Sequence, residues 1–258
     1  MAMKSTLLEL TQAILLSMQG DEVTSIADTE ESRAVAQIIK ENYFYITGKA
    51  DLPEHKELFS LVESSASTPV VMTPPTTMTT IEWIKYNHVL STETDNNFQL
   101  VTFRNKNDFL AMQEALDSDE STVDTFNLTT SNGTTPIKFI NNKMPQFYTT
   151  WNDNTILFDS YDSTEDSYLR ATKTLAYGLI DPTWTHTDAF TPDLDNRQFT
   201  LLLNEAKAQC FSELKQAQNS NAERKLKHGW VELSRTKNSL PDKVTAYSRI
   251  QGYGRKRK

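Results

Sequence analysis

Apolar residues in the first third of the chain recur every three or four positions, the spacing of one face of an α-helix. The pattern predicts a first helix over about residues 6–18, which a capping box at residues 6–9 would open. A second capping box at residues 28–31 begins a longer helix that runs to about Thr47. Its predicted buried face consists of Val35, Ile38, Ile39, Asn42, Tyr43 and Ile46. A third, shorter helix is expected from Asp51 to about Leu61.

The composition of the sequence changes after residue 64, where Ser, Thr and Pro become frequent and the helical spacing of apolar residues disappears. Short β-branched and aromatic runs follow, which are typical of strands. Asn132-Gly133 lies between two of them and indicates a hairpin, and one helix is expected over residues 106–116. The predicted strand runs are Val70–Met72, Ile81–Tyr86, Phe98–Arg104, Val123–Thr129, Ile137–Ile140, Gln146–Trp151, Thr155–Phe158 and Leu169–Ala176.

Helical spacing returns after residue 192, with Asp193 and Asp195 as candidate N-caps. The apolar positions are Phe199, Leu202, Leu203, Ala206, Cys210, Leu214 and Ala217. Because neither Pro nor Gly interrupts the run before Gly229, a single helix of roughly 35 residues is predicted. Its second half would be a solvated strut or an arm on a partner. The alternative is a break near residues 219–221, which would give two ordinary helices.

These patterns predict an α+β fold: a helical bundle with an inserted β-domain, a long C-terminal helix and an extended tail. The expected divisions are residues 1–68 for the N-terminal helices of the bundle and 69–177 for the inserted β-domain. Residues 178–234 would form the connection and the long C-terminal helix, and residues 235–258 a basic extended tail that becomes ordered on a partner.

Composition narrows the class of protein. Hydrophobic residues make up 38% of the 258 positions, which indicates a soluble protein with long polar loops or much of its surface on neighbours. The single cysteine, Cys210, excludes an internal disulfide framework and lies on the apolar stripe as a buried, inert thiol. No run approaches the ~20 apolar residues of a membrane span, and the start of the chain does not resemble a signal peptide. We therefore expect an intracellular protein without a membrane partner.

Charge is distributed unevenly along the chain. Residues 223–258 hold eleven Lys or Arg against three acidic residues, a net charge of +8, whereas residues 1–222 carry −16. This uneven charge favours two surfaces with different partners, and the basic surface would bind phosphates or acidic protein. The alternative is a solvated tail that only aids solubility.

A search for chemistry finds no catalytic motif, and we predict neither an enzyme nor a cofactor or metal site. The four histidines, His55, His88, His186 and His228, lack metal-ligand spacing. The acidic loop at residues 117–120 lacks the glycine and the closing glutamate of an EF-hand. Aromatic residues of the insertion and its return are predicted to serve core packing and protein contact: Trp83, Tyr86, Phe147, Tyr148, Trp151, Phe158, Tyr161 and Trp184.

Several segments resemble the head-to-tail adaptor proteins of short-tailed bacteriophages, also called tail tubular protein A. The matching segments are residues 21–31, 35–39, 43–44, 52–55, 82–86, 190–194 and 202–207. The resemblance implies a structural virion protein of the phage neck, assembled in the host cytoplasm into a ring of twelve copies. The ring would join the portal protein to the tail nozzle protein and let DNA pass through its lumen without specific binding. The inserted β-domain is the part that such proteins share least.

In this interpretation the C-terminal segment binds the portal. The predicted contacts are Trp230, Arg235, Lys237, Tyr247, Arg249, Tyr253, Arg255, Lys256, Arg257 and Lys258. Two alternatives stay open. One is a nucleic-acid-binding protein that uses the same tail on phosphates. The other is a tail-tube or fibre protein in which the β insertion is the working part.

Overall fold

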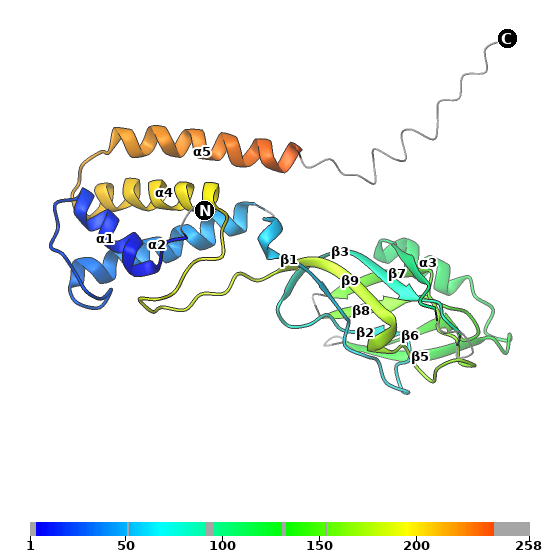
Figure 1. The fold of residues 1–258 in the computed structure, drawn as a ribbon. Coiled ribbons are helices and arrows are strands. Elements are labelled where there is room, and N and C mark those ends of the chain that lie inside the picture. The colour runs from blue at the N-terminus through cyan, green and yellow to red at the C-terminus, as the bar shows by residue number, and fades with distance from the viewer. Residues whose placement is uncertain (1–3, 51, 91–94, 131–132, 153, 240–258) are drawn as a thin grey trace, which may run out of the picture. The chain divides into compact units, whose positions relative to one another are not determined.

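The computed structural model describes residues 4–50, 52–90, 95–130, 133–152 and 154–239 (Figure 1). The chain forms two compact units. Met1–Glu54 and Pro182–Lys258 make up the helical unit, and His55–Asp181 make up the β unit, which interrupts the helical unit in sequence. The first boundary thus falls after residue 54, whereas the sequence placed it after residue 68.

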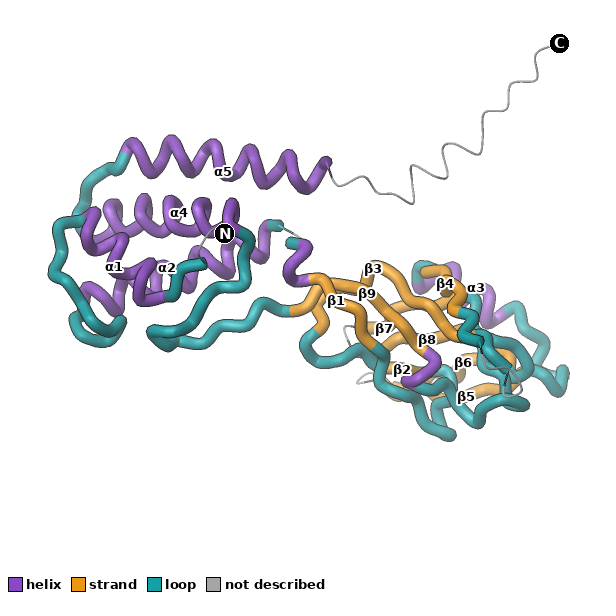
Figure 2. Tube along the Cα trace, viewed as in Figure 1, coloured by secondary structure: helices purple, strands orange, loops and turns teal. Residues whose placement is uncertain are grey.

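The helical unit contains α1 (Leu7–Ser17), α2 (Glu30–Lys49), α4 (Asn196–Leu214) and α5 (Ser220–Ser239) (Figure 2). Three of these helices begin with capping boxes, at Thr6, Thr29 and Asp195, in which the N-cap and the third helical residue bond each other's backbone N–H. The predicted box at Thr6 is confirmed. Apolar faces of α1, α2 and α4 meet in one core, and the expected buried face of α2 is buried as predicted.

The prediction of a single long C-terminal helix is wrong. Helix α4 ends at Leu214, and Gln216 adopts a left-handed conformation with φ of 49°. The Asn219 side chain then accepts a hydrogen bond from the Ala222 N–H at 3.1 Å and starts α5. The alternative of two helices is therefore correct. A straight continuation would leave the apolar stripe of α5 in water, whereas the break lets α5 fold back along α4.

The β unit is built on a seven-stranded sheet with the order β1-β9-β3-β4-β7-β8-β2. Its strands are β1 (Lys56–Phe59), β2 (Val71–Met72), β3 (Met78–Asn87), β4 (Phe98–Phe103), β7 (Phe147–Asn152), β8 (Thr155–Phe158) and β9 (Thr174–Ile180). Strands β5 (Val123–Thr130) and β6 (Gly133–Ile140) form the predicted hairpin as a second, two-stranded sheet. Helix α3 (Lys106–Glu114) lies where a helix was expected.

The predicted third helix, over residues 51–61, is wrong. A single 3-10 turn, Pro53–His55, leads directly into β1, which pairs antiparallel with β9. The predicted strand at residues 169–176 likewise starts only at Thr174, after a 3-10 turn at Ala171–Lys173. In both places, pairing with a strand far away in sequence decides the conformation.

The seven-stranded sheet curls until its two ends meet. An antiparallel bridge joins Val62, just after β1, to Thr73, just after β2, with the Val62 N–H donating to the Thr73 carbonyl at 2.8 Å. One hydrophobic core fills the inside of the curl and reaches α3 and the β5–β6 hairpin. Four of the predicted core aromatics are buried there, namely Tyr86, Tyr148, Phe158 and Tyr161.

Candidate functional site

Helix α5 has one apolar face and one basic face. Ala222 is buried, and Leu226, Trp230 and Leu233 are half-buried against the core of the helical unit. The opposite face exposes the basic residues Arg224, Lys225 and Lys227 together with His228. The spacing of three and four residues places these two sets on different sides of one helix.

Trp230 fixes the position of α5 through three interactions. Its indole N–H donates to a carboxylate oxygen of Glu205 on α4 at 3.0 Å. The edge of the Tyr45 ring meets the indole at a centroid distance of 5.8 Å and an interplanar angle of 84°. The Lys49 ammonium lies 4.1 Å from the Tyr45 centroid and 5.6 Å from that of Trp230, within range of cation–π attraction. Trp230 is thus engaged within its own chain.

Helices α4 and α5 approach each other closely at Gly229. A Cβ atom at this position would lie 2.9 Å from Cδ1 of Leu201. Gly229 lies against Leu201, whereas Lys225, earlier on α5, is close to Lys207, later on α4, so the two helices run antiparallel. Burial and, secondarily, the nearby charge of Lys225 on α5 lower the pKa of Lys207 on α4.

The predicted portal-binding residues fall into three groups. Trp230 is half-buried, as described above. Arg235 and Lys237 belong to the last turns of α5, and their side chains lie outside the described part of the structure. Tyr247, Arg249, Tyr253, Arg255, Lys256, Arg257 and Lys258 also lie outside the described residues. Among the described side chains of α5, the basic residues Arg224, Lys225 and Lys227 are exposed; they lie in the predicted portal-binding segment, residues 223–258, but not among its named contacts.

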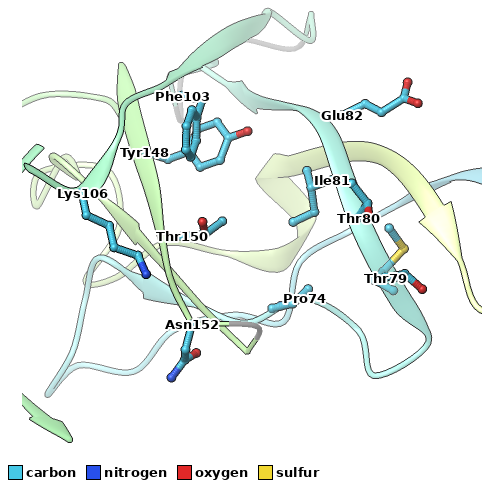
Figure 3. Close-up of a pocket in the computed structure, with 11 residues that line it drawn as sticks. Pro74, Thr79, Thr80, Ile81, Glu82, Phe103, Lys106, Tyr148, Thr150 and Asn152 are labelled. Carbon is cyan, nitrogen blue, oxygen red and sulfur yellow. The ribbon is translucent and has the colours of Figure 1, made fainter. Parts of the chain in front are cut away.

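The β unit contains a pocket of about 480 Å³ that was not predicted (Figure 3). The first half of β3, from Met78 to Glu82, forms one wall. Tyr148, Thr150 and Asn152 of β7 form the opposite wall. Phe103, the last residue of β4, and Lys106, the first of α3, also line it.

The lengths and pairing of three strands explain this pocket. Strand β4 lies between β3 and β7, but it pairs with β3 only from Ile84 to Asn87 and with β7 only at Phe147 and Tyr148. It then ends at Phe103, while β3 and β7 continue. Ladder irregularities between Met78 and Trp83 mark bulges, which twist a strand locally. The pocket therefore lies between β3 and β7 beyond the end of β4, where the sheet has no strand between them. We call this pocket the strand slot.

Titratable groups in the described residues give little indication of catalysis. The Asp159 carboxylate is buried and accepts hydrogen bonds from the N–H groups of Gln146 and Phe147 at 2.9 and 3.0 Å. Burial raises its pKa despite these bonds. Burial also raises the pKa of the Cys210 thiol to about 12, in agreement with the predicted buried thiol. No group of three His, Cys, Asp or Glu side chains suited to a metal ion occurs among these residues.

Within the part of the chain that the structure describes, none of the helices combines the length and the apolar character needed to cross a membrane. Comparison with known proteins finds neither a matching protein-family model nor a matching curated sequence.

Proposed function

We propose that this protein is a structural head-to-tail adaptor of a short-tailed bacteriophage virion. Copies of the chain form a ring, with twelve as the expected number, between the portal protein and the tail nozzle protein. The helical unit acts as a bundle whose C-terminal helix and basic tail engage the portal. DNA passes through the lumen of the ring without specific binding, and the protein acts by assembly rather than by catalysis.

The distribution of charge on helix α5 and the segment after it is the observation that carries this proposal. Helix α5 is held to α4 by its apolar face and Trp230, so that Arg224, Lys225 and Lys227 remain exposed. Beyond Ser239 the sequence adds six basic residues against one acidic residue. Such a surface suits an acidic crevice on a partner, where complementary charge speeds encounter and sets register.

The test uses phage heads that carry portal rings and lack the tail. The full chain should attach to these heads, whereas a chain that ends at Ser239 should fold equally well and attach at least tenfold more weakly. A matched variant with Arg255, Lys256, Arg257 and Lys258 changed to Gln separates charge from chain length. If the shortened chain attaches as strongly as the full chain, the tail is not the portal contact and the proposal fails.

The exposed cations of α5 also favour a second candidate, binding of nucleic acid. That function predicts an affinity for DNA that falls steeply as salt concentration rises, because each neutralised phosphate releases counterions. Filter binding at two salt concentrations distinguishes the candidates. An adaptor should retain DNA only weakly and without sequence preference, since residues 1–222 carry −16.

A further inference from the structure

The strand slot has the form of a missing β-strand. Among the described residues, none pairs with β3 before Ile84 on its β4 side, and none pairs with β7 beyond Tyr148 on that side. Since β4 separates β3 from β7 farther along, the slot is about two strand spacings wide, ~10 Å between the flanking strands. Its walls run from Met78 to Glu82 and from Tyr148 to Asn152, a length that suits about five extended residues.

The chemistry of these walls selects an extended peptide as ligand. An extended peptide is the ligand whose backbone could pair with both flanking strands, β3 and β7, at once. Thr80 and Thr150 add hydroxyl groups, and Phe103, which is 53% exposed, offers an apolar surface. Figure 3 shows Ile81 of β3 pointing toward the open space, with Phe103, Tyr148 and Thr150 on its other side.

The chain itself carries a segment of suitable chemistry, residues 243–251, which lies outside the described residues. Its sequence, Lys-Val-Thr-Ala-Tyr-Ser-Arg-Ile-Gln, is rich in residues that favour strands, and Pro241 and Gly252 flank it. In an extended conformation, Val244, Ala246 and Ile250 would share one face.

The opposite net charges of the β unit and of the C-terminal segment also favour this pairing. The β unit holds seventeen Asp or Glu against eight Lys or Arg, a net charge of −9, whereas residues 240–258 carry +5. The slot itself has one acid, Glu82, which is ion-paired with Lys56, and one base, Lys106. The attraction between segment and unit therefore comes from the overall charge of the unit, while backbone pairing supplies the register.

We propose that residues 243–251 of one copy insert as a strand into the strand slot of a second copy, before the protein meets its partner. A tail of one copy in a slot of the next is a heterologous contact, which repeats around a closed ring when the geometry permits. The inference goes beyond the proposed function and does not depend on the portal.

Sedimentation velocity on the full chain without portal tests the inference. The wild type should self-associate, and an excess of a synthetic peptide of residues 243–251 should dissociate it. The variant Thr150→Trp, which fills the slot, should be monomeric, whereas the matched variant Thr135→Trp, at an exposed position of β6, should associate like the wild type. Equal association of Thr150→Trp and wild type, or a monomeric wild type, would overturn the proposal.

A second peptide distinguishes strand pairing from simple charge attraction. Replacing Ala246 by Pro within the peptide keeps its charge but removes a backbone donor and disfavours the strand. This peptide should compete at least tenfold less well than the unmodified one. Equal competition by the two peptides would mean that charge alone holds the segment, and the strand insertion would be refuted. Because no portal is present, failure here leaves the portal assay unaffected.

Discussion

The replacement Gly178→Ala tests the close approach of β9 to the bulged start of β3, which forms one wall of the strand slot. Gly178 in β9 faces the irregular part of β3, where a Cβ atom would lie 2.1 Å from the Thr80 carbonyl oxygen and 3.0 Å from Cα of Ile81. Both contacts are with backbone, so no rotamer change can relieve them. Insertion of extra atoms into a packed site lowers the free energy of unfolding by ~1–3 kcal/mol. We expect a loss at the upper end of this range because β3 itself must move.

A loss of about 3 kcal/mol should lower the melting temperature of the β unit by about 10 °C, given its size. Calorimetry on the full chain measures this shift, and hydrogen exchange followed by mass spectrometry should show faster exchange in β3 and β9. Gly48→Ala is the matched control. A Cβ atom at Gly48, inside α2, meets nothing within 4 Å, so this change should stabilise the helical unit by about 0.5 kcal/mol.

If Gly178→Ala melts at the same temperature as the wild type and leaves exchange in β3 unchanged, the close approach of β3 and β9 is not a structural requirement. A destabilised variant that still binds the peptide of residues 243–251 would separate the stability of the unit from the peptide site.

Three further outcomes are expected. Because burial raises the folded-state pKa of Asp159 above its ordinary value of 3.8, the native state retains this proton longer than the unfolded chain, and stability falls as pH rises through that interval. Asp159→Asn keeps an acceptor for the two N–H groups, and urea titrations should show its stability relative to wild type increasing above pH 4; an unchanged difference would contradict the linkage. Trp230→Ala should lower the free energy of unfolding by about 2 kcal/mol, less than for a fully buried Trp, and should speed amide hydrogen exchange in α5. Equal hydrogen exchange in the variant and the wild type would show that Trp230 does not hold this helix. Cys210 should react with a thiol reagent at pH 8 only after denaturation, and rapid reaction of the native protein would contradict its burial.

Local sequence features determined much of the helical unit. The box at Thr6, the buried face of α2 and the N-cap at Asp195 depend on residues three or four positions apart, which are neighbours in any helix. The β5–β6 hairpin depends in the same way on residues adjacent to its turn. These elements could be predicted because the contacts that define them lie within one or two turns of chain.

Tertiary structure decided the rest. Strand β1 exists because Lys56–Phe59 pair with β9, more than a hundred residues later, and no local pattern reveals that pairing. Helix α5 folds back because Trp230 packs against α4, Tyr45 and Lys49. The helical periodicity of residues 199–233 could not distinguish this arrangement from a straight continuation. The strand slot arises from unequal strand lengths at the centre of the sheet, where β4 stops and its neighbours continue. Such features depend on which distant segments meet, and a linear pattern of polar and apolar residues specifies only the faces that are available to meet.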